Sequence, residues 1–468
     1  MKPLTGLFLA GTVLGFMALP ASAQPRPEEV FQRSLFLEKD IRDRLEGAVP
    51  TDQKTLIEWG GAYIPTYTFY DDIDGGHAHQ TRQDLRLWTQ IYVDQVHRVF
   101  ARMRMNYIDF AAGDAHGFRQ HDLEGPNLDV GYYELDVSAA AEKYGGRKWP
   151  VRLTARAGRQ YIEVGRGIAL GKILDAGLFE IEASNFSFTG FAGQSIEGED
   201  NIDRSAPGFT RSRRTFYGGE FRYTGIDRHE PYALFVIQRD WSDEKPATPF
   251  QDYRYNSQYY GVGSRGSLAP NCRYELESLW EFGRSVANGQ QDDDESIRGY
   301  AFNAEVNYYC DHPLRPVLTG EYGYASGDGD RQRATTAFLG NTAGTPDQAF
   351  QGFGYVNSGL ALGARFTNLQ FLRMGGRFTP YEKKTAAGRV DVGADYYFLF
   401  KTDKNGPISD FRAADTSADV GQELDVFVEW RILSDLSWTF RYGRFFPGQA
   451  YPDRKPRDFL FTGFSISF

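Results

Sequence analysis

The last eleven residues, Asp458–Phe468, alternate in polarity and end on a phenylalanine. A strand of this kind is expected as the closing strand of a bacterial outer-membrane β-barrel. The other end of the chain carries Lys2, an apolar run from Leu7 to Leu19 and an Ala-x-Ala site at Ala23. This run is shorter than the ~20 residues of a membrane-spanning helix. The sequence therefore predicts that residues 1–23 are a secretory signal peptide and that the protein is exported to the outer membrane.

Composition agrees with a barrel and excludes two other classes of protein. The mean hydropathy of −0.49, with no later apolar run of spanning length, excludes a helical membrane protein. A barrel can be this polar because only one face of each strand contacts lipid. Aromatic residues make up 15% of the chain, which suits the girdles at the two membrane interfaces. The formal net charge of −10 argues against a nucleic-acid partner.

The spacing of apolar residues divides the exported chain into two parts. Residues 24–54 contain one helical pattern, from Pro27 to Gly47, which predicts a short periplasmic helix. From Thr55 the period changes to two, most clearly over Asp84–Asp94. About 18 such segments follow, joined by alternately long and short connections. Residues 55–468 are thus predicted to form one all-β, antiparallel transmembrane barrel.

In such a barrel the residues that alternate with the lipid-facing ones line the lumen, and many of them here are charged. The candidate pore-lining or substrate-binding residues are Arg86, Arg102, Arg104, Arg152, Arg156, Asp136, Glu423, Asp425 and Arg441. In one interpretation these charges pair across strands and stiffen the wall. In the other, the arginines form an anion-selecting constriction, because a guanidinium binds carboxylates in a bidentate manner. Spacing alone leaves both interpretations open.

Two motifs near the C-terminus resemble those of the alginate-export porins of Gram-negative bacteria. They are Asp419-Val-Gly-Gln-Glu-Leu-Asp425 and Phe440-Arg-Tyr-Gly-Arg-Phe-Phe-Pro-Gly-Gln-Ala-Tyr451, with a weaker match at Asp84-Leu-Arg-x-Trp88. The resemblance implies a monomeric barrel of 18 strands that passes an anionic, uronate-type polysaccharide outward, and it assigns Arg86 and Arg441 to the pore. It also implies contact with lipopolysaccharide and delivery by periplasmic polysaccharide-synthesis proteins. Two of the family's pore arginines are replaced here, by Gly131 and Tyr161.

Other functions are less well supported by the sequence. A general porin, or a channel selective for sugars or small anions, is the main alternative. An enzyme is not expected, because no histidine falls on a predicted strand beside a serine. No cofactor is expected. Bound Ca²⁺ at acidic outer loops is an open alternative, but the Asp and Glu spacing matches no dedicated calcium loop.

Two further features make specific predictions. Cys272 and Cys310 fall at the periplasmic ends of adjacent predicted strands, and an oxidising compartment favours a disulfide between them. A register offset of two residues would instead leave two thiols. The connection Asp328–Phe366 far exceeds the usual loop length, so it is expected to act as a gate or plug.

Overall fold

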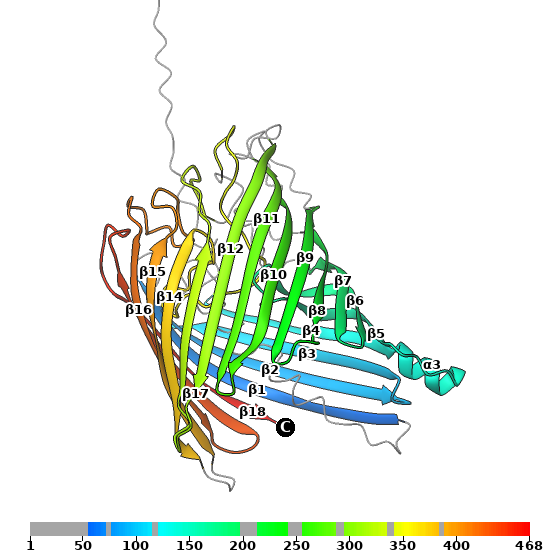
Figure 1. Cartoon of the computed structure of the whole chain (residues 1–468). Helices are drawn as coiled ribbons and strands as arrows, with labels where there is room; N and C mark the ends of the chain where they lie inside the picture. Colours follow the sequence, from blue (N-terminus) through cyan, green and yellow to red (C-terminus); the bar gives the residue numbers. More distant parts are fainter. Residues whose placement is uncertain are drawn as a thin grey trace, which may run out of the picture.

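The chain forms a closed antiparallel β-barrel of 18 strands, which confirms the predicted fold (Figure 1). The structure is a computed structural model that describes residues 55–71, 76–114, 120–196, 213–241, 255–286, 294–334, 341–382 and 388–468. Each strand pairs with the next along the chain, and β1 closes the ring by pairing with β18. The predicted signal peptide and periplasmic helix, residues 1–54, lie outside the described residues.

The strands follow the predicted segments closely. The first nine are β1 (Thr55–Asp71), β2 (His77–Val93), β3 (His97–Phe110), β4 (His121–Asp136), β5 (Arg152–Val164), β6 (Leu170–Ala183), β7 (Phe186–Ser195), β8 (Arg214–Tyr223) and β9 (His229–Asp240). The others are β10 (Tyr255–Ala269), β11 (Cys272–Val286), β12 (Asp294–Tyr309), β13 (Val317–Ala325), β14 (Leu369–Glu382), β15 (Arg389–Lys401), β16 (Asp419–Arg431), β17 (Leu436–Pro447) and β18 (Arg457–Ser467).

The two faces of the barrel differ in the way that the alternation predicts. Large apolar side chains are exposed on the outer face, for example Met103, Leu318 and Phe464. Charged and polar side chains alternate with them and are buried on the inner face, for example Arg102 and Glu321. The wall therefore presents apolar atoms to lipid and polar groups to the lumen. Among the described residues, no helix is long and apolar enough to cross a membrane.

One helix, α3 (Val137–Gly145), directly follows β4, within the part of the chain predicted to be all-β. Asp136 caps this helix by accepting a hydrogen bond from the backbone N–H of Ala139 at 2.8 Å, and Gly146 ends it in the left-handed conformation. The helix projects beyond the ends of β4 and β5 (Figure 1). The prediction that Asp136 lines the pore is therefore wrong, because its side chain is a helix cap at the periplasmic end.

The structure also contradicts the predicted disulfide. Cys272 lies opposite Tyr308 in the β11–β12 register, and Cys310 lies two residues further on, beyond the end of β12. Both side chains are free thiols. The offset has a simple cause: β12 pairs with β11 only up to Tyr308, and the backbone of Cys310 turns to bond Pro316 instead.

We expect thiol titration of denatured, unreduced protein to find both cysteines reactive, because the register offset prevents the bond. The same protein after reduction is the control and should give the same count. A titration that finds no free thiol before reduction would contradict this register.

Candidate functional site

Arginine side chains are concentrated on one part of the inner wall. We call the side chains of Arg86, Arg98, Arg102, Arg104 and Arg156, on β2, β3 and β5, the arginine wall. Alternate residues of a strand face the same side, which places Arg86 on the inner face of β2. The β2–β3 register then sets Arg86 directly opposite Arg104. Like charges directly opposite one another destabilise a sheet unless acids intervene.

Three carboxylates intervene, and two of them each serve two arginines. Asp84 lies 3.0 Å from the guanidinium of Arg86 and 2.7 Å from that of Arg104. Glu134 accepts a hydrogen bond from Arg156 at 2.7 Å and also lies 3.9 Å from Arg98. The third carboxylate, Asp129, lies 2.6 Å from the guanidinium of Arg102. In these contacts five arginines share three carboxylates.

Burial shows which arginines a solute in the lumen can reach. The side chains of Arg86 and Arg102 are 7% and 4% exposed, whereas that of Arg104 is 31% exposed. The side chain of Arg156 is 13% exposed, and its guanidinium carbon lies 4.6 Å from the centre of the Tyr132 ring. Arg104 is thus the member of the arginine wall best placed for contact. The buried arginines act on a solute through their charge, which a low-dielectric environment screens weakly.

Glutamates occupy the opposite wall. We call Glu275, Glu277, Glu281, Glu305 and Glu321, on β11, β12 and β13, the glutamate wall. In the ring of 18 strands, β11–β13 lie about half-way round from β2–β5, so the two walls face each other across the lumen. Arg373 on β14 lies 2.9 Å from Glu321.

A turn between β5 and β6 brings one more arginine to the glutamate wall. The side chain of Arg166 lies 3.2 Å from Glu275 and 3.3 Å from Glu305, and its backbone N–H donates to Glu277 at 2.9 Å. Gly165, just before it, has a φ of +60° and donates to Glu220 at 2.8 Å. The turn thus folds into the barrel. Arg166 was not among the predicted site residues, although the glycines on both sides of it could have indicated a tight turn.

The long connection between β13 and β14 also folds into the barrel. We call residues 326–368 the lumen loop; the structure describes 326–334 and 341–368. Glu423 on β16 accepts backbone hydrogen bonds from Ala361 at 2.6 Å and Leu362 at 2.9 Å, and Asp425 accepts one from Leu360 at 3.2 Å. This connection therefore packs against the inner wall, and its role as a gate or plug stays a prediction. The roles predicted for Glu423 and Asp425 are corrected: both face inward, but they hold the loop rather than a solute.

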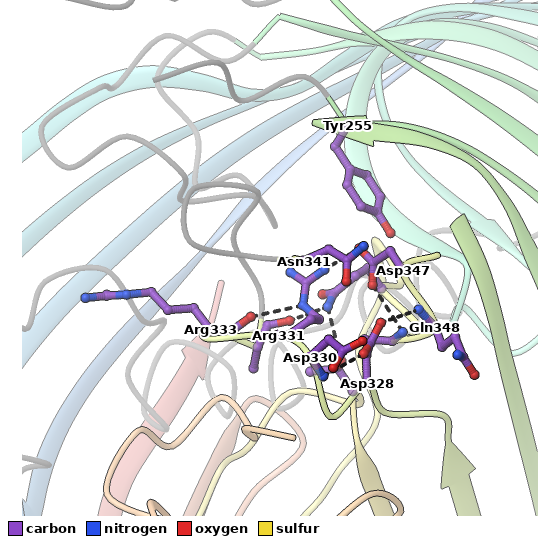
Figure 2. Close-up of polar contacts among 12 residues, drawn as sticks. Tyr255, Asp328, Asp330, Arg331, Arg333, Asn341, Asp347 and Gln348 are labelled. Atoms are coloured by element: carbon purple, nitrogen blue, oxygen red, sulfur yellow. Dashed lines mark hydrogen bonds and ion pairs between the residues drawn. The ribbon is translucent and has the colours of Figure 1, made fainter. Parts of the chain in front are cut away.

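The first part of the lumen loop is fixed by a buried ion pair. Arg331 pairs with Asp347, and their side chains are 2% and 0% exposed (Figure 2). The backbone of Asp347 bonds both Ser296 and Arg298, at the outer end of β12. Burial raises the pKa of Asp347, and the charge of Arg331 opposes that shift. Burial likewise raises the pKa of Tyr355, further along the loop, so its phenol stays neutral.

The remaining predicted residues lie at the edges of this site. Arg441 on β17 faces inward and donates to Glu429 at 2.6 Å. Arg152 lies at the periplasmic end of β5, where its side chain is 63% exposed and 3.8 Å from both Asp136 and Glu182. It therefore belongs to the mouth of the channel rather than to its wall. The described residues contain no group of three or more side chains able to hold a metal ion.

The family follows from comparison of the sequence with known protein families. The family model described as "Alginate export" matches residues 78–463, from β2 to β18. The chain belongs to the alginate export family. The family and the barrel fold are those of a transport channel in the outer membrane rather than of an enzyme. No curated protein sequence matches the chain.

Solved outer-membrane structures share the fold of this alginate export family member. OccAB1 of Acinetobacter baumannii is 11% identical, with a TM-score of 0.52 over 88% of this chain and 97% of its own. OccK11 (OpdR) of Pseudomonas aeruginosa is 11% identical, with a TM-score of 0.51 over 88% and 96%. OpdK of the same species, solved with vanillate, is 10% identical, with a TM-score of 0.51 over 88% and 98%. At these identities the similarity concerns the fold alone.

Proposed function

We propose that this outer-membrane channel exports an anionic, uronate-type polysaccharide along its arginine wall. The observation that carries the proposal is the pairing pattern on β2–β5, where Asp84 and Glu134 each serve two arginines. A cluster of arginines on one wall attracts carboxylates, and Arg104, whose side chain is 31% exposed, can bind them. Membership of the alginate export family supports this choice of cargo.

The geometry also suits release of the cargo. Each arginine of the wall already has a carboxylate partner, so a uronate competes with an internal acid instead of filling an empty site. Conduction requires contacts of this replaceable kind, because a solute must leave a site as readily as it enters. We further propose that the channel is a monomer contacted by lipopolysaccharide and supplied by periplasmic polysaccharide-synthesis proteins.

Planar-bilayer recording tests the proposed cargo. Under a salt gradient we expect a reversal potential that favours anions, and a current that soluble polyuronate blocks. A neutral polysaccharide of the same length is the matched control and should block little. An unselective current that polyuronate does not affect would instead indicate a general diffusion porin.

The variant Arg86→Gln/Arg104→Gln should shift the reversal potential toward cations, because it removes both positive charges that Asp84 compensates and leaves that carboxylate. The block by polyuronate should weaken as well. Arg315→Gln is the control: Arg315 lies in the turn between β12 and β13, 2.8 Å from Glu382. If the double variant and the control have the same reversal potential, the arginine wall does not select anions.

A further inference from the structure

Among the described strands, one stretch of β4 is paired on one side only. β4 spans His121–Asp136, but within the described strands it pairs with β5 only from Gly131 to Asp136. We call His121–Val130 the open edge. Side chains there are exposed on both faces, and the outward-pointing Leu123 and Leu128 are 60% and 46% exposed.

The missing partner is the outer end of β5. Residues Gln160–Val164 continue β5 and pair with β6, but not with the open edge. Gln160, Ile162 and Val164 are 1–2% exposed, so this end of the strand lies against the interior. Where the ladder stops, the side chain of Arg159 donates to the backbone carbonyl of Leu128 at 2.9 Å, in place of a strand.

The β5–β6 hairpin is held inward by the lumen loop. The backbone N–H of Phe353 donates to Ala169 at 3.0 Å, and that of Gly171 donates to Phe353 at 3.3 Å, so Leu170 and Phe353 form a parallel bridge. Ala169 and Leu170 are fully buried there. The turn contacts of Arg166 with the glutamate wall hold the hairpin from the other side.

An open edge at this position is costly. Leu123 pairs with Tyr107, and Leu128 pairs with Met103, so large apolar side chains flank the open edge on the outer surface. Sheet edges that face hydrocarbon do not persist, because their N–H and C=O groups find no partner in lipid. Pro126, which has no N–H, lowers this cost at one position without removing it.

We propose that the outer end of the β5–β6 hairpin is a gate with two docking positions. In the position seen here it pairs with Phe353 and narrows the lumen. In the other it pairs with the open edge of β4, which completes the wall and widens the lumen. The inference concerns gating and does not depend on the cargo, so its tests use salt current alone.

Adding one methyl group at the contact between the β5–β6 hairpin and the lumen loop should separate them. A Cβ at Gly354 would lie 1.5 Å from the carbonyl oxygen of Gly167, so Gly354→Ala should separate the two. We expect its open-channel conductance to rise. The control is Gly320→Ala on β13, where an added Cβ meets no atom within 4 Å.

Cysteine pairs in the background Cys272→Ala/Cys310→Ala report on the two positions. Leu170→Cys with Phe353→Cys joins residues that form the parallel bridge and should lock the gate inward. Leu128→Cys with Tyr161→Cys should lock it in the wall. Gly131 pairs with Arg159, and Asp129 is an extra residue in a bulge of β4. If the β4–β5 register continued past this bulge, the outward-facing side chains of Leu128 and Tyr161 would lie opposite each other.

Oxidation of the inward pair should lower the conductance, and oxidation of the wall pair should raise it, with both effects reversed by reductant. The wall pair should also cross-link faster when combined with Gly354→Ala. Recovery on reduction shows that each variant is folded, and single-cysteine variants control for the substitutions. A wall pair that never cross-links, or two locks with equal conductance, overturns the proposal.

Discussion

Replacing Glu423 with alanine should greatly increase the conductance and the current noise of single channels. Glu423 is fully buried and accepts two backbone hydrogen bonds from the lumen loop, from Ala361 and Leu362. A typical hydrogen bond contributes about 0.5–1.5 kcal/mol net. Their loss should release this part of the loop from β16, and a loop free to move both widens the lumen and makes its width fluctuate.

Two further variants separate loop release from loss of charge. Glu423→Gln keeps one carbonyl acceptor, so its conductance should lie between those of the wild type and Glu423→Ala. Glu429→Ala removes a carboxylate from the same strand, but one that bonds Arg441 rather than the loop. If Glu423→Ala conducts like Glu429→Ala, the lumen loop is held by other contacts.

Substitution of Arg331 by methionine should destabilise the outer part of the lumen loop by about 3–5 kcal/mol, the usual cost of removing one partner from a buried ion pair. The carboxylate of Asp347 would remain fully buried without its cation. Amide hydrogen exchange over Ala349–Gln351 measures the effect. The double variant Arg331→Met/Asp347→Leu should restore slow exchange, because an apolar pair needs no compensating charge.

The defect should also depend on pH in a defined direction. Burial raises the pKa of Asp347, and loss of Arg331 removes the charge that opposes this shift. A carboxyl whose pKa is raised by folding binds its proton more tightly in the folded state. The Arg331→Met loop should therefore regain stability as the pH falls through that raised pKa and lose it as the pH rises. Exchange equally fast at low and high pH would contradict this account.

The fold could be predicted from the sequence because each strand carries its own signal. The alternation over Asp84–Asp94 reappears in β2, and that near the C-terminus reappears in β18. Helix α3 was missed because Val137–Ala141, which is apolar except for Ser138, also continues a strand pattern. Only the two caps distinguish a helix from a strand here. Asp136 accepts a hydrogen bond from a backbone N–H at the start of the helix, and Gly146 ends it in the left-handed conformation.

The candidate site could be predicted only in part. Alternation places Arg86, Arg104 and Glu423 on the inner face, as observed. Their partners depend on contacts that no local pattern encodes: Ala361 reaches Glu423 from 62 residues away. The disulfide prediction was wrong for a related reason. Cys272 pairs with Tyr308 rather than Cys310, and such a shift in register leaves the alternation within each strand unchanged.

The opposition of the arginine and glutamate walls has a consequence for how a chain molecule would travel. To the extent that the two walls differ in charge, they would set up an electric field directed across the channel. A transverse field does no net work on a charge that moves along the axis, so it would neither drive nor resist passage. It would exert a torque on each ring of a uronate polymer, turning carboxylates toward β2–β5 and hydroxyls toward β11–β13. A polymer whose successive units differ in the direction of their carboxylates would have to rotate about its own axis as it advances.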